Sequence, residues 1–173
     1  MYIGDSMAKL DKGVLDTGPC LHLHEIKSMD SLNILKIKVI SAEVEKELYE
    51  WAVPVKGIKN VEIKQLLPFS KDIAKFITDY YSLQLGEATS IALAQQEKIT
   101  LFFTDDLEAR EVAKSYKLEV HGTLGILLRA FREKIIQKNE VILLIDRLQT
   151  ESSLFITSDL IIWIKKEVEK YTK

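Results

Sequence analysis

Cysteine is nearly absent from this sequence: Cys20 is the single example among 173 residues. One cysteine excludes an intramolecular disulfide, and it also excludes zinc sites that are built on several thiolates. No Cys-His-Asn pattern accompanies it. We therefore expect Cys20 to be a buried apolar thiol rather than a nucleophile.

Long apolar runs and a strong excess of charge are also lacking. No run approaches the roughly 18 to 20 residues that span a bilayer, and charged residues such as Asp5, Lys9 and Asp11 interrupt the N-terminal segment where a signal peptide would be apolar. We therefore expect a cytoplasmic protein without a membrane association. The net charge of −2 argues against wrapping of nucleic acid by the whole surface. It leaves room for a local basic rim around an acidic site.

What is present is typical of a globular protein, with 47% apolar and 29% charged residues. A chain of this length buries about two-thirds of its unfolded surface, so it needs neither a disulfide nor a structural metal. We expect one domain, or one domain with a helical appendage.

Short apolar segments alternate with helical patterns along most of the chain. Gly13-Val14-Leu15 predicts a buried strand, and residues 35–40 alternate apolar residues with lysine, as in a half-exposed strand. Ser41 follows as the expected N-cap of a helix over residues 42–51, and Ser70 as that of a helix over residues 71–81. Further strands are expected at residues 61–66, 99–103 and 118–120, and further helices at residues 17–26, 87–98, 107–116, 123–137, 141–148 and 158–171.

This alternation predicts an α/β fold, in which a mostly parallel central sheet is covered by helices on both faces. We divide the chain into a lead-in (residues 1–12), an α/β core (13–122) and a helical C-terminal extension (123–173). The extension either packs on the core or forms an interface. An apolar stripe that contains Leu124, Leu127, Leu128 and Phe131 fits both possibilities.

Acidic residues directly follow two of the expected strands. Asp16 follows Gly13-Val14-Leu15, and Asp105 and Asp106 follow Leu101-Phe102-Phe103-Thr104. Ligands of open α/β sheets bind outside the carboxyl ends of the strands, near a switch in strand order. These positions predict an electronegative pocket.

Two helical glutamates are expected to join this pocket. Glu47 borders the apolar stripe of its helix, with Glu43 one turn earlier as the alternative, and Glu87 falls between Ile91 and Ala94 on the apolar face of another helix. A carboxylate that faces a protein interior is costly unless something compensates its charge. Clustered carboxylates suit Mg²⁺ or Mn²⁺, which prefer oxygen ligands and support phosphoryl chemistry.

Several short motifs occur in order along the chain. They are Asp16-Thr17-Gly18-Pro19, Glu47 within Val44-Glu45-Lys46-Glu47-Leu48, Gly86-Glu87-Ala88, and Thr104-Asp105-Asp106 followed by Arg110. Together with Gly122-Thr123-Leu124-Gly125 and the closing helices, this pattern resembles the PIN-domain family, and in particular its prokaryotic toxin-like branch.

The resemblance implies a PIN-like three-layer α/β/α sandwich and a metal-dependent endoribonuclease that hydrolyses RNA phosphodiester bonds. It also implies Mg²⁺ or Mn²⁺ as cofactor. The candidate metal-binding and catalytic residues are Asp16, Glu47, Glu87 and Asp106, with Asp105 as a further metal ligand and Thr104 and Arg110 in support. Many members are toxins paired with an antitoxin, so the expected partners are RNA and an antitoxin protein. We also expect a homodimer.

Several assignments stay open at this point. Asp105 and Glu108 match a capping box, which would leave Asp106 as the freer ligand, and Arg110 is as well suited to a structural ion pair as to phosphate. His22 and His24 point about 200° apart on a helix, so we expect packing or surface roles rather than one shared metal. Trp51 and Trp163 are expected in the core or at an interface.

Other functional classes fit less well. The chain has no Walker A or Gly-x-Gly-x-x-Gly motif, and Asp16-Thr17-Gly18 departs from the Asp-x-Asp of haloacid-dehalogenase-type phosphatases. The main alternative is a catalytically silent PIN-like module that binds RNA or a protein.

Overall fold

A five-stranded parallel sheet forms the centre of the computed structural model, which describes residues 10–171. Its strands are β1 (Leu10–Leu15), β2 (Leu35–Ser41), β3 (Val61–Lys64), β4 (Leu101–Phe103) and β5 (Glu119–His121). The spatial order is β3-β2-β1-β4-β5, and every pair of neighbours is parallel. β2 and β3 thus follow β1 on one side of it, and β4 and β5 lie on its other side. The strand order therefore reverses between β1 and β4.

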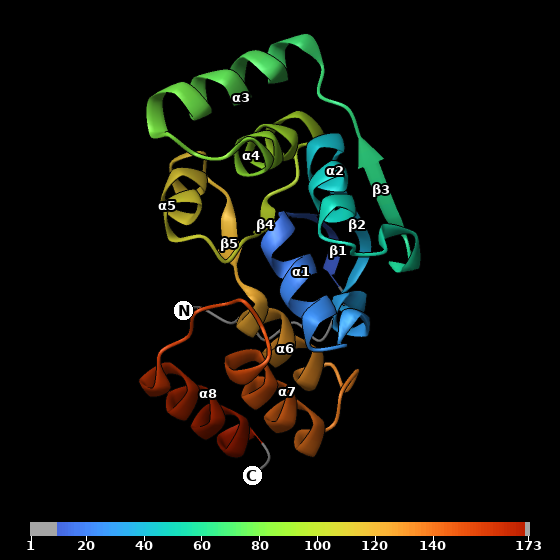
Figure 1. Cartoon of the computed structure of the whole chain (residues 1–173), viewed down its shortest axis with the longest axis vertical. Coiled ribbons are helices and arrows are strands. Elements are labelled where there is room, and N and C mark those ends of the chain that lie inside the picture. The colour runs from blue at the N-terminus through green and yellow to red at the C-terminus, as the bar shows by residue number, and fades with distance from the viewer. Residues whose placement is uncertain (1–9, 172–173) are drawn as a thin grey trace.

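Helices surround this sheet on both faces (Figure 1). The α-helices are α1 (Thr17–Glu25), α2 (Ala42–Glu50), α3 (Pro68–Tyr81), α4 (Leu85–Glu97), α5 (Leu107–Ser115), α6 (Thr123–Arg132), α7 (Lys138–Thr150) and α8 (Ser158–Tyr171). Two short 3₁₀ helices are η1 (Met29–Ile34) and η2 (Val55–Gly57). No helix within the described range is both long and apolar enough to cross a bilayer.

Two hydrophobic cores lie on opposite faces of the sheet, because successive side chains of a strand point to opposite sides. Val14 and Phe102 belong to the core that includes residues of α3, α4 and α5, whereas Leu15 and Phe103 belong to the core with α1, α2, α6, α7 and α8. The expected three-layer α/β/α sandwich with a parallel sheet is therefore confirmed.

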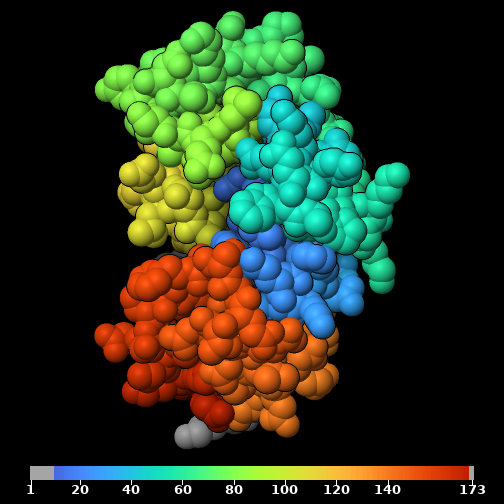
Figure 2. All heavy atoms as spheres, viewed as in Figure 1, coloured from blue at the N-terminus to red at the C-terminus, as the bar shows by residue number. Residues whose placement is uncertain are grey.

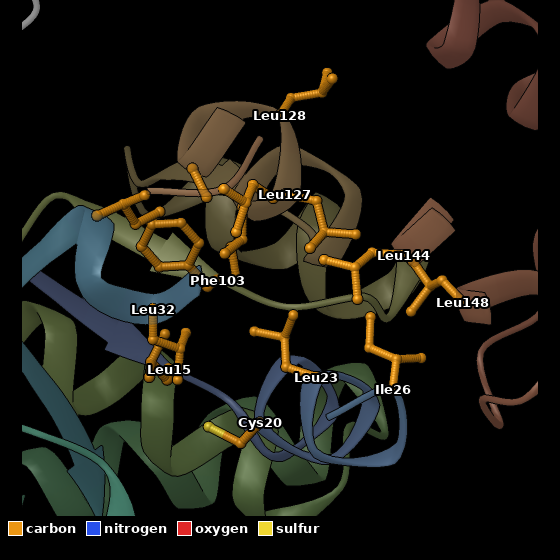
Figure 3. Close-up of a cluster of buried hydrophobic side chains, with 14 of the residues drawn as sticks. Leu15, Cys20, Leu23, Ile26, Leu32, Phe103, Leu127, Leu128, Leu144 and Leu148 are labelled. Carbon is orange, nitrogen blue, oxygen red and sulfur yellow. The ribbon is translucent and has the colours of Figure 1, made fainter. Parts of the chain in front are cut away.

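The C-terminal helices complete the second core. Leu127, Leu128 and Phe131 of α6 are buried within the chain itself. Figure 3 shows Leu127 with Leu144 and Leu148 of α7 near Leu23 and Ile26 of α1. The apolar stripe of α6 thus serves the core of this chain.

Two local expectations are wrong. The helix expected to start at Lys71 begins at Pro68, so Ser70 lies buried inside α3 and is not its N-cap; proline suits the first turn because its missing N–H has no intrahelical partner there. Lys38 is buried rather than exposed, since η1 packs against β2 at this position. Its Nζ donates to Asn33 Oδ1 at 3.3 Å.

β1 also begins at Leu10, earlier than the sequence pattern indicated. Leu10 pairs with Leu35, and Lys12 with Ile37, so the end of the expected lead-in is part of the sheet. By contrast, Ser41 caps α2 as expected, because its hydroxyl accepts from Val44 N at 3.1 Å.

Candidate active site

A pocket of about 550 Å³ opens at the carboxyl ends of β1 and β4, where the strand order reverses. We call it the acidic pocket, because five of the carboxylates expected to form a site line it: Asp16, Glu47, Glu87, Asp105 and Asp106. Glu50 lines it as well. In the space-filling view, dark blue atoms from the start of the chain lie in a hollow between the green, cyan and yellow surfaces (Figure 2). Carboxylates that are up to 90 residues apart in the sequence thus share one cavity.

Asp16 is fixed at the bottom of this arrangement by hydrogen bonds to both of its carboxylate oxygens. Oδ1 accepts from Thr17 N at 2.7 Å, which makes Asp16 the N-cap of α1, and Oδ2 accepts from Thr104 Oγ1 at 2.8 Å. The backbone N–H of Asp16 donates to the carbonyl of Phe103, so the residue also ties β1 to β4. Its position is therefore set by the sheet and not by a flexible loop.

The surroundings of Asp16 disfavour its negative charge. Burial raises its pKa to about 6, and the charges of Glu47 and Asp105 add to the increase, although the hydrogen bonds from Thr104 and Thr17 oppose it. Only 5% of the residue is exposed to solvent. A positive charge in the acidic pocket would relieve this cost.

Glu47 reaches the acidic pocket from α2. Thr17 Oγ1 donates to its Oε2 atom, and Gly86 in the first turn of α4 lies directly against its carboxylate. Glu43, the alternative one turn earlier, instead lines a separate cavity with Leu66, Lys71 and Ala74. The tertiary structure thus brings Glu47, and not Glu43, to Asp16.

Glu87 enters from the N-terminus of α4, where it forms a capping box with Gln84. Its Oε2 accepts from Gln84 N at 2.9 Å. Burial raises the pKa of Glu87 to about 7, with further increases from the charges of Asp16, Asp106 and Glu47. Two carboxyl groups of this pocket therefore have raised pKa values, in part because they repel each other and their neighbours.

Asp106, and not Asp105, has the capping role that the sequence suggested for Asp105. Asp106 is the N-cap of α5, and its Oδ1 accepts from Ala109 N at 2.7 Å. The expected capping box on Asp105 and Glu108 is wrong because α5 begins at Leu107, one residue later than that box requires. Asp106 is nevertheless solvent-exposed and lines the acidic pocket.

Asp105 is held by hydrogen bonds to residues that are distant in the sequence. Its Oδ2 lies 2.7 Å from His22 Nδ1, and its two oxygens accept from the backbone N–H and the hydroxyl of Thr123 at 2.7 and 2.5 Å. Burial would raise the pKa of Asp105, but the hydrogen bonds from His22 and Thr123 outweigh that effect and lower it. Asp105 is thus an ionised carboxylate of fixed orientation.

The two expected supporting residues lie in different places. Thr104 is fully buried between the acids, since it donates to Asp16 and its hydroxyl accepts from Asp106 N at 3.2 Å. Arg110 lines a neighbouring cavity instead of the acidic pocket. Within the described part of the chain it makes no ion pair, so the structural ion pair considered from the sequence is not formed there.

Several residues of the pocket were not expected there. Trp51 is 63% exposed and lines the acidic pocket, so of the two places expected for it, core or interface, the core is excluded: α2 ends at Glu50, and the turn carries the indole outward. His22, Thr17 and Phe155 also line it. No local signal marks His22 or Phe155, because their partners are brought together only by the packing of α1 and of the α7–α8 loop.

A family model described as "PIN domain" matches residues 12–170, which is nearly the whole chain. The chain belongs to the PIN-domain family. PIN domains are generally nucleases that use divalent metal ions, so this is a nuclease-type fold whose expected substrate is nucleic acid. No curated protein and no solved structure matched the chain in the corresponding comparisons.

The donor set of this PIN domain suits a hard divalent cation, because carboxylate oxygens are the ligands such ions prefer. No three His, Cys, Asp or Glu side chains among residues 10–171 already stand in an arrangement that would hold an ion. Asp16, Glu47 and Glu87 each accept hydrogen bonds from within the chain. Every carboxylate oxygen has a second lone pair, so these hydrogen bonds leave each carboxylate able to bind a cation.

Proposed function

We propose that this protein is a metal-dependent endoribonuclease that hydrolyses RNA phosphodiester bonds, with Mg²⁺ or Mn²⁺ held in the acidic pocket. The observation that carries the proposal is the convergence of Asp16, Glu47, Glu87, Asp105 and Asp106 from four separate segments on one pocket. Burial, with a smaller contribution from the neighbouring carboxylates, raises the pKa values of Asp16 and Glu87, which supports a site that gains from a bound cation.

Electrostatics makes a cation necessary for binding as well as for chemistry. A phosphodiester carries a negative charge, and without a cation the carboxylates of the pocket would repel it. A bound divalent ion would neutralise the charge of the carboxylates and activate the attacking water. The acids of the pocket are therefore useful for RNA cleavage only together with the cation.

The roles of the individual residues follow from their surroundings. Asp16 is the most firmly held carboxylate and would be the central ligand, with Glu47, Glu87 and Asp106 around it. Asp105 would complete the pocket in an orientation fixed by His22 and Thr123. Thr104 would position Asp16 and would not itself contact the RNA, because it is fully buried.

A cleavage assay tests the proposal. The purified chain should cut RNA on addition of Mg²⁺ or Mn²⁺ and should stop cutting in excess chelator. Asp16→Asn should abolish cleavage with the fold intact, because asparagine also caps helices well but lacks the charge. Asp72→Asn, on the exposed face of α3, is the matched control and should cleave like the wild type.

The alternative function is a silent PIN-like module that binds RNA or a protein. A folded wild-type protein that binds single-stranded or structured RNA, yet never cuts it with either metal, would establish that alternative. The presence of all the expected acids in one pocket favours the enzyme.

The biological setting that we propose is the toxin half of a toxin–antitoxin pair. Expression of the chain should then arrest growth in a host that lacks its partner, Asp16→Asn should not, and an adjacent antitoxin gene should restore growth. The homodimer stays a prediction, which light scattering of the purified protein would test. Phe69, Phe76 and Tyr80 of α3 are exposed and suit such a contact.

A further inference from the structure

A second cavity of about 630 Å³ lies next to the acidic pocket and differs from it in chemistry. We call it the apolar cavity. Its walls include Val120, Leu124, Phe155, Leu160 and Trp163. Asp105, Leu154 and Phe155 line both cavities, so the two adjoin each other. A molecule that occupies the acidic pocket can therefore extend into the apolar cavity.

Phe155 stands at the junction with 89% of its surface exposed. Its neighbours in the α7–α8 loop are nevertheless anchored. Ser153 donates to Glu25 Oε2 through its backbone N–H at 2.8 Å and through its hydroxyl at 3.1 Å, and Ile156 is buried. The loop thus holds the ring of Phe155 in solvent at a fixed position. Exposure of this apolar surface is unfavourable, and packing within the described residues does not offset it.

Positive charge borders the same cavity. Arg110 and Lys114 of α5 line it. Arg110 Nε is buried without a hydrogen-bond partner in the described residues, and the guanidinium lies beside Gly122 without forming an ion pair there. A buried guanidinium N–H that lacks an acceptor is costly, and an anionic ligand nearby would lower that cost.

We propose that the apolar cavity is a base-binding subsite, which takes one nucleobase of the RNA strand whose phosphate lies in the acidic pocket. The base stacks on Phe155 with Trp163 on the cavity wall, and Arg110 faces the next phosphate along the strand. This inference rests on the proposed function, because it extends the same bound strand.

The chemistry of a nucleotide matches the side chains of the two cavities. A flat apolar base is joined through its ribose to a phosphate, and the two cavities that share Asp105 and Phe155 carry aromatic, cationic and acidic side chains. Aromatic side chains stack on any unpaired base, whereas a base inside a duplex is not available to them. The subsite therefore selects a nucleotide whose base is splayed out of a helix.

The test measures binding separately from cleavage. The full wild-type chain is titrated with a fluorescein-labelled ten-nucleotide RNA in Ca²⁺, which also binds carboxylate oxygens, and the anisotropy gives Kd; a gel of the RNA after the titration checks that it is uncut. Adding Phe155→Ala should raise Kd about 5- to 100-fold, the range for loss of one stacked base. Phe155→Tyr should keep binding, because it keeps the ring. Phe69→Ala removes another exposed aromatic, which lies on α3 and lines neither cavity, and is the matched control.

An abasic scan identifies the base. RNAs with one abasic position each should bind normally except at one position, and there Phe155→Ala should have no further effect. An unchanged Kd for Phe155→Ala, or a loss that persists at every abasic position, would overturn the subsite. A Phe155→Ala protein that binds RNA normally but changes from dimer to monomer would show that the cavity is a contact between copies.

The two proposals fail differently. If the wild type never cleaves RNA but Phe155→Ala weakens binding, the nuclease assignment falls and the subsite stands. If the wild type cleaves and Phe155→Ala changes neither KM nor Kd, the subsite falls and the nuclease stands.

Discussion

The carboxylate of Glu47 lies so close to Gly86 that a Cβ atom at residue 86 would stand 2.5 Å from both of its oxygens. Gly86 belongs to the first turn of α4, one residue before Glu87. The missing side chain therefore allows α4 to approach α2, which brings Glu47 and Glu87 into the same pocket.

Gly86→Ala should displace the carboxylate of Glu47 and lower the rate of RNA cleavage. A displacement of about 1 Å in an active site costs about 100-fold in rate, so we expect a kcat loss of that order. The helix itself should tolerate alanine, which is favoured over glycine by about 1 kcal/mol inside helices. Single-turnover cleavage and circular dichroism together measure both effects.

Gly57→Ala provides the control, because a Cβ there would meet no atom within 4 Å. It should leave cleavage unchanged. Equal kcat values for Gly86→Ala and the wild type would show that Glu47 does not act in cleavage.

Asp16 should make the stability of the metal-free protein depend on pH. Its folded pKa of about 6 lies above the ordinary 3.8, so the folded state holds this proton more tightly than the unfolded state. The free energy of unfolding should therefore fall as pH rises from about 4 to about 6 and stay lower above that range. The full contribution is at most about 3 kcal/mol.

Asp16→Asn should remove this dependence. Urea unfolding at pH 4 and pH 8, with chelator present, should show a smaller loss of stability in the variant than in the wild type. Parallel pH profiles for the two proteins would contradict a raised pKa at Asp16.

Divalent ions should stabilise the folded protein, because they offset the repulsion among the clustered carboxylates. Mg²⁺ at a hundredfold excess over its Kd should stabilise the wild type by about 2.7 kcal/mol, which thermal unfolding at pH 7.5 would detect. Asp106→Asn keeps a residue that caps α5 but removes one ligand, so its gain in Tm should be smaller. Asp159→Asn, an exposed acid at the start of α8, should respond like the wild type.

His22 should stabilise the fold through Asp105. Removing a partner of a buried charged group costs about 1–3 kcal/mol, so His22→Ala should lower the free energy of unfolding by that amount at pH 7. His22 helps to hold the pKa of Asp105 below its ordinary value of 3.8. The stabilisation by His22 is therefore present above pH 3.8 and is lost as the pH falls and Asp105 becomes protonated. His24→Ala, two residues along α1, should show no such loss.

The sequence predicted the sheet and most of its helices because each strand and helix carries its own apolar period. It also placed Asp16 and Asp105-Asp106 at strand ends, since parallel strands expose their carboxyl ends on one edge. Errors arose where burial depends on neighbours. Lys38 looked exposed because alternation within β2 cannot show that η1 packs against the strand there.

The residues of the site divide in the same way. The sequence by itself determined which acids were available, because their types, their order and their positions after strands or on helix faces are local properties. Only the tertiary structure decided between Glu43 and Glu47, gave the capping role to Asp106, and paired Asp105 with His22. It also placed Trp51 and Phe155 at the pocket, since these contacts depend on how α2 and the α7–α8 loop pack against elements far away in the chain.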